Sequence, residues 1–345
     1  MILQKIHDST GVRFIDGAPN FGSNSTKFAG FEGSVKCLIF SNDGKRCAWI
    51  ANGQLLFIKR DNRNRLGELK CPFSSSVSCR PQNNDFFLKF WRFYVSFTPE
   101  QNKGDAQASP NLSVYDVSGK KLLKAFFQQS QTDWQPQWTG DETIMARNVT
   151  NEVHFYKADD LQNIVEKKIL QKVKSFSLSP STGPHHVTFY VPSIKAAPAF
   201  VHLYRYPNFK DASCALANKS FFKVDSVETH WNKQNSAALL LTAAEMDKSG
   251  TSYYGEQMLF YLSTKGDSTR ITFSKQGNIH SVAWCPNGQE FFAVYGTMPS
   301  KATLFNHKCD PVAEFGNGAR NTVMVNPVGN VVLLGGFGNI SGRME

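Results

Sequence analysis

Short apolar runs recur along the whole chain, separated by clusters of Gly, Pro, Asn, Asp and Ser. Runs of about four to eight residues that are bounded by turn residues are typical of β-strands. Apolar positions at helical spacing are scarce, and the best helical candidate, residues 159–174, fits a strand followed by a loop equally well. The pattern therefore predicts an all-β protein.

Residues 35–61 contain the clearest repeating unit. Residues 35–41, 46–51 and 54–59 are apolar runs, joined by Asn-Asp-Gly-Lys at 42–45 and by Asn-Gly at 52–53. Asn, Asp and Gly accept left-handed backbone at little cost, so both connections predict hairpin turns. Three antiparallel strands in a meander make up most of one blade of a β-propeller.

The same succession of strands and turns repeats along the sequence. From the first turn at residue 42 to the last at residue 327 there are 285 residues in six intervals, so one unit takes about 47 residues, the period of propeller blades. A β-sandwich also has many short strands, but seven such units exceed what one sandwich needs. We predict one propeller domain of WD40-like blades over residues 1–345. The first turns lie near Asn42, Gln82, Gly140, Pro180, Lys233, Pro286 and Pro327, and two of them follow a Trp, Trp231 and Trp284.

The net charge of +10 and the pI of about 9.2 indicate polyanionic partners. A positive field favours encounter with RNA and with ribosomes. Two segments concentrate the cations, and each is either a phosphate-binding surface or a solvated loop. They contain Lys59, Arg60, Arg63 and Arg65, and Lys167, Lys168, Lys172 and Lys174.

Membrane insertion and disulfide bonding are not indicated. The amino terminus lacks the apolar stretch of a signal peptide, and no run approaches the length of a membrane span. The seven cysteines are odd in number and contain no Cys-x-x-Cys pair, and Cys37, Cys47 and Cys285 lie in apolar strand patterns as core residues. We expect a soluble cytoplasmic protein without membrane contact.

The sequence offers no catalytic or metal-binding motif. It has no Gly-x-Ser-x-Gly nucleophile elbow and no Gly-Lys-Ser/Thr phosphate loop. His154 alternates with Val and Phe, as a histidine satisfied within a sheet does, and the adjacent His185 and His186 point opposite ways on an extended chain. We expect no catalytic residue, no cofactor and no metal, and so no enzyme.

Five stretches go beyond the general pattern of propellers. In this order they resemble the eukaryotic translation initiation factor 2A family, and the resemblance extends from 14–19 to 342–345. The stretches are 146–155 (ARNVTNEVHF), 215–223 (ALANKSFFK), 252–257 (SYYGEQ), 308–312 (KCDPV) and 335–339 (GGFGN).

The resemblance implies a nine-bladed propeller followed by a flexible charged tail. It also implies association with the small (40S) ribosomal subunit, with other initiation factors and with mRNA, and delivery of initiator methionyl-tRNA without the GTP-dependent route. The sequence stops where the family continues into its last blades and tail, so we expect the tRNA and mRNA contacts to lie in that further part. Residues 78–91 depart from the family pattern and predict an irregular blade.

The resemblance also directs attention to two groups of candidate partner contacts. Phe221 and Phe222 are expected to anchor a blade interface, with Lys219 and Lys223 at the rim. Tyr253 and Tyr254, in a long insertion, either meet a base or a protein partner or pack on a neighbouring blade. The alternative function is a propeller that recruits initiation or stress-signalling proteins without touching RNA.

Overall fold

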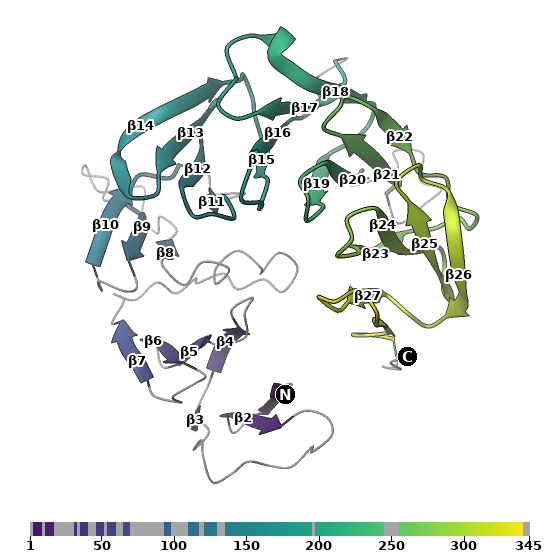
Figure 1. Cartoon of the computed structure of the whole chain (residues 1–345), viewed down its shortest axis with the longest axis horizontal. Coiled ribbons are helices and arrows are strands. Elements are labelled where there is room, and N and C mark those ends of the chain that lie inside the picture. Colours follow the sequence, from purple (N-terminus) through teal and green to yellow (C-terminus); the bar gives the residue numbers. More distant parts are fainter. Residues whose placement is uncertain are drawn as a thin grey trace. The chain divides into compact units, whose positions relative to one another are not determined.

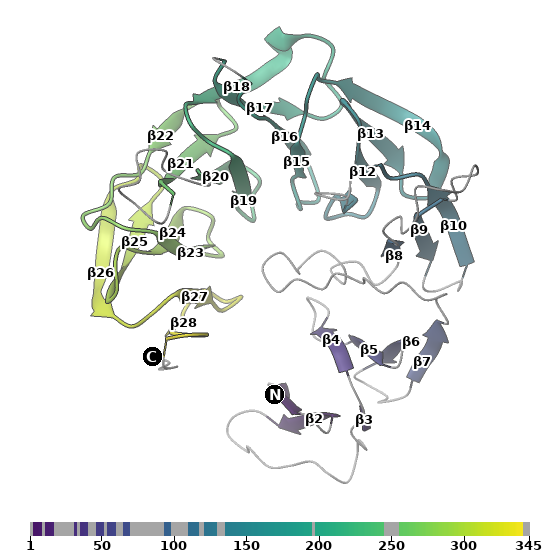
Figure 2. The same ribbon diagram turned by 180° about the vertical axis from the view of Figure 1, so that it is seen from behind.

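The chain is all-β and forms successive antiparallel sheets (Figures 1 and 2). The computed structural model describes residues 3–8, 11–16, 31–32, 35–40, 46–51, 54–59, 65–69, 93–97, 110–116, 121–129, 135–194, 197–244 and 255–340. Before residue 110 it describes side chains for Phe93 and Val95 only. Two compact units divide the chain, 1–131 and 132–345.

The first unit contains three sheets among its described residues. They are β1 (Leu3–Asp8), β2 (Gly11–Asp16) and β3 (Phe31–Glu32); β4 (Val35–Phe40), β5 (Arg46–Ala51), β6 (Gln54–Lys59) and β7 (Arg65–Leu69); and β8 (Phe93–Phe97), β9 (Leu112–Asp116) and β10 (Lys121–Phe126).

Within its described residues the second unit contains four four-stranded sheets and one pair of strands. They are β11 (Gln137–Trp138), β12 (Ile144–Val149), β13 (Glu152–Lys157) and β14 (Asp160–Ile169); β15 (Ser175–Leu178), β16 (His186–Val191), β17 (Ala199–Arg205) and β18 (Ala215–Phe221); β19 (Ser226–Trp231), β20 (Ala237–Ala243), β21 (Gln257–Ser263) and β22 (Ser268–Arg270); β23 (Ile279–Trp284), β24 (Glu290–Tyr295), β25 (Ser300–Asn306) and β26 (Pro311–Gly318); and β27 (Thr322–Val325) and β28 (Val332–Gly335).

Every sheet of the second unit pairs its strands in chain order, as a meander. Figure 1 shows the first strands, β11, β15, β19 and β23, on the inner side of this unit and the fourth strands on its outer side. The predicted propeller of WD40-like blades is confirmed, with one refinement: a blade has a fourth, outer strand. The candidate helix at 159–174 is the strand β14 and a following turn, and the count of nine blades and the single domain stay predictions.

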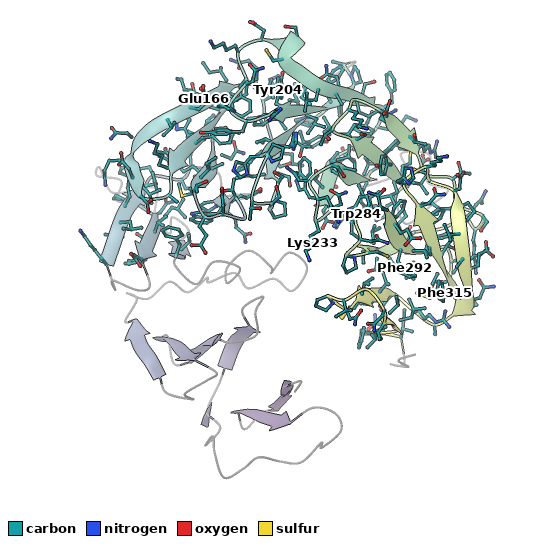
Figure 3. The ribbon with its side chains drawn as sticks, viewed as in Figure 1. Glu166, Tyr204, Lys233, Trp284, Phe292 and Phe315 are labelled. Atoms are coloured by element: carbon teal, nitrogen blue, oxygen red, sulfur yellow. The ribbon has the colours of Figure 1, made fainter. Side chains whose placement is uncertain are left out.

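Apolar side chains fill the space between consecutive sheets of the second unit (Figure 3). Phe155 of β13 packs with Phe189 and Tyr204 of the next sheet, and Phe221 of β18 packs with Phe260 of the sheet after it. These rings are 0–6% exposed. Burial of this extent excludes water from the space between consecutive sheets and fixes the spacing between these sheets.

The two tryptophans of the repeat make equivalent hydrogen bonds in successive blades. Trp231 Nε1 donates to Ser177 Oγ at 3.0 Å, and Trp284 Nε1 donates to the carbonyl oxygen of His230 at 2.8 Å. Each indole thus joins its own first strand to the first strand of the preceding sheet. The Trp before the turn is therefore a device that ties inner strands together.

The turns after the first strands are also joined from blade to blade. Gly140 N donates to Ser181 O at 2.9 Å, and Asn232 Nδ2 donates to Gly288 O at 3.0 Å. A Cβ atom at Gly140 would lie 2.2 Å from Pro180 O, so a larger residue does not fit there. Contacts of this kind hold the turns of neighbouring blades in register.

No helix within the described ranges is long and apolar enough to cross a membrane.

Candidate nucleic-acid interface

Antiparallel meanders place their turns on two opposite faces. Turns that follow first and third strands lie at one end of each sheet, which we call the odd face, and turns that follow second and fourth strands lie at the other, the even face. In the second unit the odd face comprises the described turns 139–143, 158–159, 179–185, 206–214, 232–236, 264–267, 285–289, 307–310 and 326–331. The even face comprises 150–151, 170–174, 192–194, 197–198, 222–225, 244, 255–256, 271–278, 296–299, 319–321 and 336–340.

The two faces differ in the sign of their charge. Among these described turns the even face has five cations and two carboxylates, and the odd face has four cations and six carboxylates. The even-face residues are Lys172, Lys174, Lys223, Lys275 and Arg320 with Asp225 and Glu256, and the odd-face residues are Lys210, Lys233, Lys265 and Lys308 with Asp141, Glu142, Asp159, Asp211, Asp267 and Asp310.

Three exposed lysines lie in two turns of the even face, and we call Lys172, Lys174 and Lys223 the lysine cluster. Lys174 Nζ donates to the carbonyl oxygen of Asp225 at 3.0 Å, so the turns 170–174 and 222–225 lie side by side. Lys172 and Lys223 both have left-handed backbone, with φ of 61° and 55°. Concentrated, exposed cations of this kind suit the phosphates of a nucleic acid.

The turn that bears Lys172 and Lys174 is fixed by its neighbours. Lys172 N donates to Asn151 Oδ1 at 2.7 Å, and Asn148 Nδ2 donates to Lys174 O at 2.9 Å. Both asparagines come from β12 and the turn that follows it. The amide side chains therefore hold the backbone of the turn, while the side chains of Lys172 and Lys174 remain exposed.

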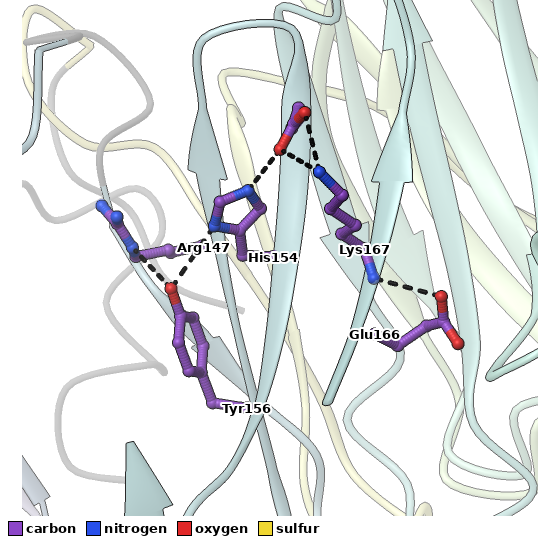
Figure 4. A network of polar contacts seen from close by, with 6 residues as sticks. Arg147, His154, Tyr156, Glu166 and Lys167 are labelled. Carbon is purple, nitrogen blue, oxygen red and sulfur yellow. Dashed lines mark hydrogen bonds and ion pairs between the residues drawn. The ribbon is translucent and has the colours of Figure 1, made fainter. Parts of the chain in front are cut away.

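Lys167 is exposed but its charge is paired. Lys167 Nζ lies 3.3 Å from Glu152 Oε1. The polar contacts continue from Glu152 through His154 to Tyr156 and Arg147, and Figure 4 shows the last three of these side chains together with Lys167. The hydrogen bond from His154 Nε2 at 2.6 Å, ahead of the contact with Lys167, holds the pKa of the Glu152 carboxyl below its ordinary value. His154 is thus satisfied within the sheet as expected, and Lys167 has a carboxylate partner.

Lys168 is not a surface cation, which corrects the sequence prediction. Its side chain lies on the opposite face of β14 from Lys167 and is 8% exposed. Nζ donates to the carbonyl oxygen of Phe209 at 2.7 Å and lies 4.5 Å from the ring centroid of Tyr204. Strand alternation explains the error, because neighbouring residues of a strand face opposite ways. Burial lowers the pKa of Lys168.

The turn after β18 corrects a second prediction. Phe221 is 3% exposed and anchors the interface between two sheets, as expected, but Phe222 is 73% exposed and anchors nothing in it. Lys219 lies with its Nζ 5.1 Å from the ring centroid of Phe260 and so takes part in the same interface. Lys223 is the exposed cation of this segment.

The remaining candidates are only partly described. Lys59 is the last residue of β6 and Arg65 is the first of β7, so they flank the connection between a third and a fourth strand. Their side chains, together with Arg60, Arg63, Tyr253, Tyr254 and the irregular segment 78–91, lie outside the described residues, as do the side chains of Cys37 and Cys47.

The described histidines and cysteines form no metal site. No group of three or more His, Cys, Asp or Glu side chains in the described ranges could hold an ion. His185 pairs with Asp141 at 3.3 Å, and the adjacent His186 is buried and contacts Asn235, with 2.8 Å between its Nδ1 and the amide nitrogen. Cys285 is buried as predicted, and burial raises the pKa of its thiol to about 11.

Two cations of the even face had not been singled out from the sequence. Lys275 donates to the carbonyl oxygen of Pro299, and Arg320 Nη1 donates to Phe315 O at 2.8 Å. Neither lies in a run of charges, so composition alone gave no signal. Only the partition of turns between the two faces connects them with the lysine cluster.

Known proteins extend these observations. The family described as "Eukaryotic translation initiation factor eIF2A" matches residues 219–345. A relative from Drosophila melanogaster named eukaryotic translation initiation factor 2A is 39% identical over 330 residues, which cover 90% of this chain and 49% of that protein. The predicted resemblance to the eukaryotic translation initiation factor 2A family is confirmed.

Solved structures agree with the fold of this initiation factor 2A relative. A crystal structure titled as a eukaryotic initiation factor superposes with a TM-score of 0.80 at 27% identity, covering 99% of this chain and 79% of that one. The C-terminal WD40 domain of Sif2 superposes with a TM-score of 0.51 at 12% identity and covers 90% of this chain and 80% of that one. The chain spans about half the length of the curated relatives it matches.

Proposed function

We propose that this chain is a non-enzymatic cytoplasmic initiation factor whose propeller docks to the small ribosomal subunit through the even face. Similarity to the initiation factor 2A family supports a role in translation initiation. The difference in charge between the two turn faces is the observation that carries the docking surface. In the complete factor this docking would support GTP-independent delivery of initiator methionyl-tRNA.

Rigid display of charge is the proposed mechanism. The packed interfaces between sheets and the tied inner strands fix the turns, so the lysine cluster meets ribosomal RNA without first being ordered. Binding of this kind saves the entropy that a flexible basic tail would lose. Its free energy comes largely from release of counterions from the RNA.

Co-sedimentation with purified small ribosomal subunits over a series of salt concentrations tests the proposal. If the lysine cluster neutralises about three phosphates, the logarithm of the binding constant should fall with the logarithm of salt concentration at a slope of about −2 to −3. A binding constant that does not change with salt concentration, or no binding at low salt by a folded sample, would contradict the proposed docking. The chain would then be a protein-recruiting propeller without RNA contact.

A further inference from the structure

One aromatic side chain on the even face is exposed to an unusual degree. Phe222 is 73% exposed, the largest value among the exposed aromatic side chains that the structure describes. Its neighbour Phe221 is 3% exposed. An exposed ring of this size loses the free energy that burial would provide, about 1.5 to 3 kcal/mol for such a side chain. The interface between the sheets is already filled by Phe221, so Phe222 has no packing task there.

The turn that carries Phe222 is held firmly in place. Val224, two residues later, is 1% exposed, and its carbonyl oxygen accepts a hydrogen bond from Tyr190 OH at 3.1 Å. Asp225 N donates to Ala243 O at 2.9 Å. The ring therefore projects from a fixed support, which lowers the entropic cost of a contact made by it.

The surroundings of Phe222 are cationic. Lys223 follows it directly, and Lys174 reaches the same turn through its bond to Asp225 O. Three lysines of the cluster stand against one carboxylate, Asp225. This excess of positive charge disfavours a basic or purely apolar partner and favours a chain of phosphates.

We propose that Phe222 stacks on an unpaired base of single-stranded RNA while Lys223 and Lys174 contact the adjacent phosphates. An aromatic ring beside lysines is the arrangement that binds single strands without sequence preference. Bases in an RNA duplex are stacked on one another and offer no face to such a ring. The inference rests on the proposed function and narrows its ligand to an unpaired segment.

Fluorescence anisotropy with a labelled oligouridine of about twelve nucleotides and with an RNA duplex of equal length tests this inference. Phe222→Ala should weaken binding of the single strand by about 5- to 150-fold, the effect typical of one stacked base, and should leave the salt slope and the duplex affinity unchanged. Phe222→Trp should retain or improve the affinity. Phe315→Ala, which removes a 41% exposed ring from the outer strand β26, is the matched control and should have no effect.

The outcomes separate this inference from the docking proposal. If Phe222→Ala binds the oligonucleotide as the parent chain does, the stacking role is overturned, whatever the ribosome experiment shows. If Lys223→Ala lowers the salt slope while Phe222→Ala changes nothing, RNA docking survives and stacking does not. Equal weakening of the single strand and the duplex by Phe222→Ala would also overturn it, because a general loss of structure would then explain the change.

Discussion

The burial of single side chains distinguishes the predicted RNA-contact residues that are exposed from those that pack inside the fold. Lys167 and Lys168 are adjacent, yet one faces solvent and a carboxylate and the other is enclosed between Tyr204 and Phe209. A run of basic residues in the sequence does not reveal this difference, since both belong to the same strand. The exposure of Phe222 was missed for the same reason, because two adjacent Phe residues look equally apolar.

His186 provides a test at this scale. Burial lowers its pKa, although the contact with Asn235 partly offsets the effect, and its side chain is 5% exposed. The folded protein therefore binds a proton at His186 less tightly than the unfolded chain does, in which a histidine titrates near pH 6.5. Stability is therefore complete above that pH and decreases as the pH falls through it toward the lower folded pKa.

The expected result is a lower midpoint of thermal unfolding at pH 5.5 than at pH 7.5. His186→Gln should reduce this dependence on pH even if it lowers stability at both values. His307→Gln, in an exposed turn, is the control and should retain the full dependence. A pH dependence in His186→Gln equal to that of the parent chain would refute the assignment.

At the scale of elements, the sequence predicted the meander but not the complete blade. Three strands of each unit carry continuous apolar runs, and their turns at Gly140, Pro180, Lys233, Pro286 and Pro327 all lie between first and second strands as expected. The fourth strands are more polar because one edge is free, as in β22 with three exposed residues. They were therefore interpreted as loops or as a helix candidate.

The tryptophan ties allow a test of how blades are joined. Trp231→Phe keeps an aromatic ring but removes the bond to Ser177 Oγ, and Ser177→Ala removes the acceptor. Urea unfolding of both single variants and the double variant gives the coupling free energy. We expect about 0.5–1.5 kcal/mol, the usual contribution of one hydrogen bond. Coupling near zero would mean that the indole contributes through packing alone.

For the whole molecule, the net charge predicted binding to RNA but did not indicate which surface binds it. The net charge of +10 is the difference between 38 cations and 28 carboxylates, which are distributed along the whole sequence. The fold sorts the described turn charges onto two faces, and this sorting depends on strand order, which composition does not contain. Family resemblance identified the biological process, and the arrangement of turns proposes the surface.

Co-sedimentation of two triple variants with small ribosomal subunits at one low salt concentration tests directly whether the even face binds the ribosome. The first changes Lys172, Lys174 and Lys223 of the even face to Ala, and the second changes Lys233, Lys265 and Lys308 of the odd face. Both remove the same charge from exposed turns. We predict at least about tenfold weaker binding for the even-face variant alone, from roughly 0.5 kcal/mol or more per lost phosphate contact. Equally weakened binding of both variants, or weakened binding of the odd-face variant only, would contradict docking through the even face.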